Sequence, residues 1–83
     1  MIMDDEVYKI NENGERVEGF PNWKGKFHPD STEGNLWMYI WDENGNTIQI
    51  EQGTRIRYSS DCTSENYIIK DACTPGIYNV QRL

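Results

Sequence analysis

Residues 8–17 read YKINENGERV and residues 39–48 read YIWDENGNTI, so one pattern occurs twice in a chain of 83 residues. Each copy has an apolar segment, an Asn-Gly pair and a second segment that ends in an aliphatic residue. Asn-Gly is the preferred centre of a two-residue type I′ turn, in which both central residues need positive φ. The repeat therefore predicts two β-hairpins, with turns at Asn13-Gly14 and Asn44-Gly45.

Counting outward from each turn predicts the pairing of the strands. Ile10 is expected opposite Val17, and Trp41 opposite Ile48. Alternation along the second hairpin then places on one face Trp37, Tyr39, Trp41, Ile48 and Ile50. A slip of one residue would exchange the two faces, so this strongly aromatic face is expected to fix the register.

The rest of the chain also has the pattern of short strands. Ile56 and Tyr58 alternate with two arginines, residues 67–69 are β-formers, and Pro75-Gly76 fits a type II turn before a last strand at 77–80. The count of about six to seven short strands, with no convincing helix, predicts an all-β fold. We expect a small antiparallel barrel-like or strongly bent sheet, forming a single small domain over residues 1–83.

Residues 21–35 are expected to form a long loop that connects the two hairpins. Its first part alternates aromatic and basic side chains, at Trp23, Lys24, Lys26 and Phe27. Such a loop could stack bases and neutralise phosphates, or hold an acidic peptide. The alternative, which we favour, is that the two aromatic side chains plug an open end of the sheet and leave the lysines in water.

Charge constrains the kind of partner. The chain has 14 acidic and 8 basic residues, a formal net charge of −6, which disfavours direct binding to nucleic acid or to an anionic membrane. No segment approaches the roughly 20 apolar residues that span a bilayer. The acidic start of the chain does not resemble a signal peptide, so a cytoplasmic protein is expected, inside the host cell if the protein is viral.

Acidic residues gather at the two predicted hairpin tips, Glu12 and Glu15 on the first and Asp42 and Glu43 on the second. If the tips lie side by side, they form an acidic edge that suits a basic partner. A solvated polar face is the simpler interpretation of any single charge cluster.

Residues for catalysis or metal binding are scarce. Cys62 and Cys73 have ten residues between them, and His28 is the single histidine, which falls short of a zinc site. Free thiols are expected, although a disulfide fits the spacing. The acidic turn at Asp42 matches only the first part of a calcium loop. We therefore expect no enzyme, no cofactor and no metal site.

The resulting functional hypothesis is a non-enzymatic protein–protein interaction module. In its most concrete form it is a small acidic antagonist, of the kind viruses and mobile elements encode, that blocks a basic surface on a nucleic-acid-processing protein. One alternative is a small barrel that binds a nucleotide or single-stranded nucleic acid through the 21–35 loop. Its site would comprise Trp23, Phe27, Arg55 and Arg57, with Lys24 and Lys26 beside it. The other is a homo-oligomeric structural subunit that pairs exposed strands.

Overall fold

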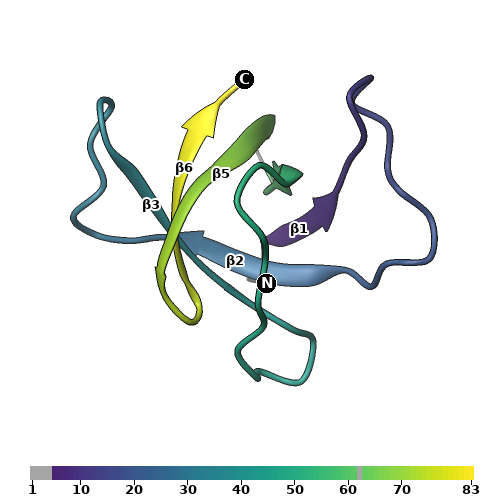
Figure 1. Cartoon of the computed structure of the whole chain (residues 1–83), viewed down its shortest axis with the longest axis horizontal. Coiled ribbons are helices and arrows are strands. Elements are labelled where there is room, and N and C mark those ends of the chain that lie inside the picture. Colours follow the sequence, from purple (N-terminus) through teal and green to yellow (C-terminus); the bar gives the residue numbers. More distant parts are fainter. Residues whose placement is uncertain (1–4, 62) are drawn as a thin grey trace.

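A computed structural model describes residues 5–61 and 63–83, the side chain of Cys73 excepted, as six antiparallel strands that close into a barrel (Figure 1). The strands are β1 (Glu6–Lys9), β2 (Trp23–Phe27), β3 (Leu36–Trp41), β4 (Arg55–Ser59), β5 (Ser64–Thr74) and β6 (Ile77–Arg82). Their order around the barrel is β1-β2-β3-β6-β5-β4. Two three-stranded meanders therefore close on each other through the β1–β4 and β3–β6 pairs, which confirms the predicted all-β barrel.

The barrel is filled by side chains that alternate along its strands. Ile56 and Tyr58 of β4 are buried, as are Tyr67 and Ile69 of β5, in agreement with the predicted strands. Alternate residues of a strand point to opposite faces, so the remaining residues of these strands lie outside. The other buried side chains of this single cluster are Val7, Trp23, Met38, Ile40, Ile50, Tyr78 and Val80.

The turn type predicted from Asn-Gly is wrong. Gly14 has φ of 82°, but no non-glycine residue among those described has positive φ, so Asn13 does not adopt a type I′ conformation. Instead Gly14 N–H donates to the Asn11 carbonyl (3.0 Å), and Asn11 N–H donates to the Glu15 carbonyl (2.8 Å). This is a three-residue loop built on a type I turn followed by a left-handed glycine.

An Asx side chain explains the choice of turn in both copies. Asn11 Oδ1 accepts hydrogen bonds from the N–H groups of Asn13 (2.9 Å) and Glu15 (3.0 Å). Asp42 Oδ1 accepts the equivalent pair, and its bonds measure 2.9 and 2.8 Å. Type I turns favour Asn or Asp at the first position and Gly at the fourth. The sequences NENG and DENG carry that pattern. The prediction from the Asn-Gly pair alone did not take the first residue of the turn into account.

The longer turn shifts the register by one residue. Ile10 pairs with Arg16 and Trp41 pairs with Thr47, each one position earlier than predicted. Each is an isolated bridge, and the chain after it does not continue as a strand. The twin hairpins are therefore only turns with one closing pair.

The register change divides the predicted aromatic face, because Ile48 and Ile50 no longer lie on the same face as Trp41. Met38 and Ile40 are fully buried, whereas Trp37, Tyr39 and Trp41 are half-buried on the outer surface of the barrel. The aromatic side chains of β3 thus lie outside the core. Ile50, by contrast, is buried in the core, and the Tyr78 hydroxyl holds the chain on either side of residue 49. That hydroxyl donates to the carbonyl of residue 48 (2.5 Å) and accepts from the N–H of residue 50 (3.2 Å).

The segment expected to be a loop over residues 21–35 contains β2, which pairs with β1 and β3. Gly25 lies buried at the centre of β2. A Cβ at Gly25 would lie 2.7 Å from Val7 Cγ2 and 3.0 Å from the Tyr39 carbonyl oxygen. Glycine in a strand marks such a close approach, which is how β2 fits between its neighbours. The turn at Pro75-Gly76 forms as predicted, with Gly76 at φ of 88°.

Candidate interaction surface

The outer surface of β2 and β3 carries basic side chains opposite aromatic ones. Lys24 lies opposite Trp41, and Lys26 opposite Tyr39, on adjacent antiparallel strands. Trp37 continues the same row of alternate β3 residues. We call this surface the aromatic face, comprising Lys24, Lys26, Trp37, Tyr39 and Trp41.

The aromatic face is held in place by local contacts. Lys26 Nζ lies 5.7 Å from the centre of the Tyr39 ring, a cation–π arrangement. The His28 ring lies 5.1 Å from the same ring. Ser31 Oγ donates to the Trp37 carbonyl (2.8 Å) and accepts from the Trp37 N–H (2.9 Å). These contacts support the backbone of Trp37 and the ring of Tyr39 on the outer surface.

Two shallow hollows flank Tyr39 and Trp41. The β6-side hollow has a volume of about 370 Å³ and is lined by Tyr39, Ile40, Trp41, Gly45, Thr47, Pro75, Gly76 and Ile77. The β2-side hollow has a volume of about 420 Å³ and is lined by Lys26, Pro29, Tyr39 and Trp41. Tyr39 and Trp41 line both, so they form a rib between two depressions whose other walls include proline and aliphatic side chains.

Of the residues proposed for binding from the 21–35 segment, Trp23 is part of the core and Phe27 is partly buried against it. Trp23 is 9% exposed and belongs to the core cluster. The Phe27 ring meets Tyr58 and Tyr67 edge-on, with ring centres 5.0 and 5.7 Å apart. These contacts agree with the favoured interpretation that Trp23 and Phe27 plug the sheet. Lys24 and Lys26, which alternate with them, face outward.

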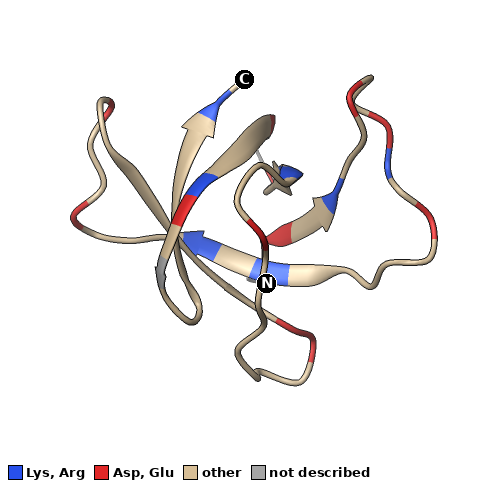
Figure 2. Ribbon diagram, viewed as in Figure 1, with Lys and Arg blue, Asp and Glu red and all other residues tan. Residues whose placement is uncertain are grey.

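The acidic residues of the two turns do not form one edge. Glu12, Glu15 and Glu43 are exposed, and Asp42 is half-buried because its side chain closes the turn. Figure 2 shows the first turn on an arm at the upper right and the second at the bottom of the molecule. Acidic residues occur on most of the connecting segments, whereas β2 carries two basic residues. The charge is thus spread around the barrel rather than gathered at the tips.

Arg57, considered for nucleotide binding, anchors the first turn. Its Nε donates to Asn66 Oδ1 (2.9 Å) and its Nη2 donates to the Gly14 carbonyl (3.0 Å). Two hydrogen bonds of a guanidinium fork fix both partners. The side chain therefore ties the first turn to β4 and β5.

Two tyrosines at one end of the barrel donate to carboxylates. Tyr58 bonds to Asp5, and Tyr67 donates to Glu65 Oε2 (2.8 Å), which also pairs with Arg82 Nε (3.0 Å). Burial, and then the carboxylate that each hydroxyl meets, raise the pKa of Tyr58 and of Tyr67. Both phenols are therefore neutral hydrogen-bond donors at physiological pH.

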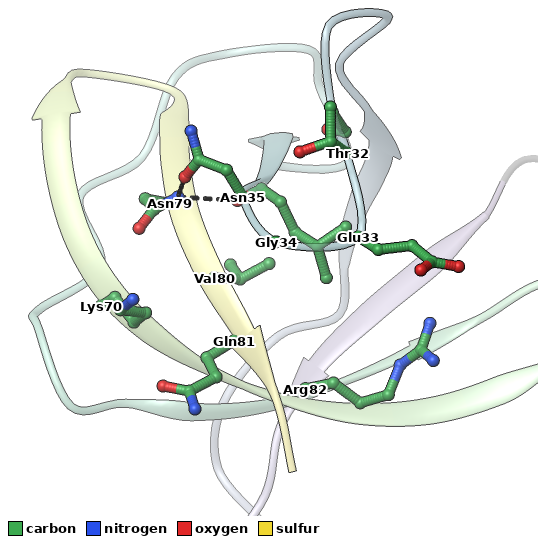
Figure 3. Close-up of a pocket in the computed structure, with 11 residues that line it drawn as sticks. Thr32, Glu33, Gly34, Asn35, Lys70, Asn79, Val80, Gln81 and Arg82 are labelled. Atoms are coloured by element: carbon green, nitrogen blue, oxygen red, sulfur yellow. Dashed lines mark hydrogen bonds between the residues drawn. The ribbon is translucent and has the colours of Figure 1, made fainter.

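A polar hollow of about 760 Å³ lies between the 31–36 segment and β6, with Lys70 on its far wall (Figure 3). Asn79 Nδ2 donates to Asn35 Oδ1 (2.9 Å) and to the Leu36 carbonyl (2.9 Å), across the hollow's upper part. These bonds tie β6 to the start of β3. The amide groups of Asn35 and Asn79 thus act within the fold.

Metal chemistry finds no support in the part of the chain that is described. No three His, Cys, Asp or Glu side chains gather there as a metal site would require. The expectations for Cys62 and Cys73, free thiols or a disulfide, fall outside the described side chains. The described residues also include no helix long and apolar enough to cross a membrane.

No known protein family, curated protein or solved structure matches this chain. The candidate site is therefore assigned from the geometry of the structure alone. Sequence reasoning placed Trp37, Tyr39 and Trp41 on one face but used that face only to fix the register, so it was not considered as a binding surface. The signal that could have corrected this is the lysine at alternate positions of β2, since Lys24 and Lys26 must face water.

Proposed function

We propose that this domain is a non-catalytic protein–protein interaction module that binds its partner through the aromatic face. The observation that carries the proposal is the outward direction of Trp37, Tyr39 and Trp41, while Met38 and Ile40 of the same strand fill the core. Tyrosine and tryptophan are enriched at protein interfaces, because they combine a large apolar area with a polar group.

A protein partner fits this surface better than single-stranded nucleic acid. Stacked bases need nearby cations for their phosphates. Lys24 and Lys26 provide two, but the β6-side hollow is walled by Pro75, Ile77 and other uncharged residues. The net charge of −6 also repels a polyanion. Apolar side chains of a protein would fill both hollows without that cost.

The test compares two surfaces of the same molecule. The wild-type domain is used to capture proteins from a lysate of its source, and a captured protein is then purified and titrated calorimetrically. Tyr39→Ser/Trp41→Ser removes the rib of the aromatic face, and Glu12→Lys/Glu15→Lys reverses the charge of the first turn as a matched surface control. We expect the first variant to lose binding about tenfold or more, as for interface aromatic residues, and the second to bind like the wild type.

The opposite pattern would support the acidic antagonist instead. In that case charge reversal at Glu12 and Glu15 weakens binding, rising salt weakens it further, and loss of Tyr39 and Trp41 has no effect. Retention of nucleic acid rather than protein would favour the small nucleic-acid-binding barrel. Either result would overturn the assignment of the aromatic face to a protein partner.

A further inference from the structure

The two hollows beside Tyr39 and Trp41 restrict what can occupy the aromatic face. One lies toward β2 and the other toward β6, on either side of β3. Neighbouring strands lie about 4.8 Å apart, so the hollows are separated by roughly 5–10 Å across the strands. Two or three residues of a polyproline II segment, which rises about 3.1 Å per residue, span that distance.

The walls of the hollows specify the side chains that would enter them. The β6-side hollow includes the side chains of Pro75 and Ile77, and the β2-side hollow includes Pro29. Apolar and aromatic walls accept proline or branched aliphatic side chains, because these side chains have no hydrogen bonds to water that burial would break. The backbone of such a segment would cross over the Tyr39–Trp41 rib.

Charge gives the segment a direction. Lys26 is exposed and lines the β2-side hollow, and Lys24 lies on the same outer surface of β2. The residues that line the β6-side hollow include no charged side chain. An acidic residue is therefore favoured at the end of the segment that lies over β2, and an uncharged residue at the end over β6.

We infer, on the basis of the proposed function, that the aromatic face binds an extended acidic segment of a partner protein. The segment places two apolar residues, two or three positions apart, in the two hollows, and an acidic residue beside Lys26. The closed barrel has its strands paired in one continuous order. Recognition therefore uses side-chain pockets on the sheet surface rather than addition of a strand to an open edge.

The experiment uses isotope-labelled whole domain and a synthetic peptide with two prolines separated by two alanines and preceded by two glutamates. A control peptide has lysines in place of the glutamates, and an oligothymidylate is the nucleic-acid probe. The readout is the indole N–H resonances of Trp37 and Trp41, with the core residue Trp23 as an internal reference. We expect saturable shifts of the two outer indoles with the acidic peptide, and binding about tenfold weaker for the lysine peptide.

Charge variants separate direct contact from general attraction. Lys26→Glu should reverse the preference between the two peptides. Lys70→Glu makes the same charge change at an exposed residue of β5 and should leave the preference unchanged. Equal binding of both peptides, shifts at Trp23 instead of the outer indoles, or shifts caused by the oligothymidylate alone would overturn the inference.

Failure of this inference is distinguishable from failure of the proposed function. If a purified partner requires Tyr39 and Trp41 but neither peptide shifts the outer indoles, the extended-segment inference is wrong and the aromatic face still binds a protein. If the partner binds equally well without Tyr39 and Trp41, both are wrong.

Discussion

The inner and outer faces of β3 both lack charged side chains but have different roles. Met38 and Ile40 are fully buried, whereas Trp37, Tyr39 and Trp41 remain half-buried on the outside. Hydrophobicity alone would put the larger aromatic side chains in the core, because they bury more area. The neighbouring strand decides which face of β3 turns inward. The strand β2 can turn only its Trp23–Gly25–Phe27 side inward, so its lysines lie on the outer surface.

Truncating two neighbouring residues of β3 separately, one on each face, should give the largest difference in stability. Ile40→Ala leaves a cavity in the core and should cost about 2–5 kcal/mol of the free energy of unfolding. Tyr39→Ala removes a half-buried ring on the outer surface and should cost about 1 kcal/mol. Urea unfolding followed by circular dichroism measures both. Equal losses would show that Tyr39 is as much a part of the core as Ile40.

Gly25→Ala tests how closely the inner face of β2 is packed. The added methyl would meet Val7 and the Tyr39 carbonyl, and relief of these contacts requires a shift of β1 or β3. Overpacking of this kind costs about 1–3 kcal/mol. Gly34→Ala is the matched control, because a Cβ at Gly34 meets nothing within 4 Å. A neutral Gly25→Ala substitution would contradict the described fit of β2 between its neighbours.

The turn after β3 should affect stability less, since it acts at the end of the strand. Asp42→Ala removes the acceptor of two backbone N–H bonds, in a turn that opens to water. A loss of roughly 1 kcal/mol is expected, because a net hydrogen bond contributes about 0.5–1.5 kcal/mol. Glu43→Ala, at the exposed neighbour, should leave the thermal midpoint unchanged. Equal effects of the two substitutions would argue that the Asx bonds do not fix this turn.

The smallest effect concerns the inner-face phenol of Tyr67. Its raised pKa means that the folded state favours the neutral phenol, so its contribution to stability is complete below the ordinary value near 10. That contribution is lost as the pH rises through the raised pKa. A Tyr67→Phe variant should therefore lose less stability than the wild type when the pH rises from 9 to 11. The change in the urea midpoint between these pH values measures this loss, and Tyr8→Phe is the control. An unchanged alkaline slope would contradict this role.

Much of the fold could be predicted from alternation and turn residues. The strands at Ile56–Tyr58 and at residues 67–69, the Pro75-Gly76 turn and the small all-β barrel-like architecture followed from local patterns that the tertiary structure does not override. The register at Asn13-Gly14 was missed because the side chain of Asn11, two residues earlier, competes for the same backbone groups. Local turn chemistry of this kind extends beyond the central pair of residues.

The candidate site was harder to predict, because it combines residues that become neighbours only when the barrel closes. Pro29, Trp41 and Ile77 come from three different parts of the chain, and the two hollows exist only when β3 lies between β2 and β6. The one-residue error in register also grouped Tyr39 and Trp41 with Ile48 and Ile50 on one face, although Ile50 is buried in the core. A slip of one position exchanges every side chain between the two faces of a strand.

The most direct test of the account is calorimetric titration of a purified partner protein into the wild-type domain and into the Tyr39→Ser/Trp41→Ser variant, after circular dichroism has shown that both are folded. The account predicts that the folded variant binds about tenfold more weakly or not at all, because interface aromatic residues dominate binding energy. Undiminished binding by a folded variant would contradict the claim that the outer face of β3 is the interaction surface.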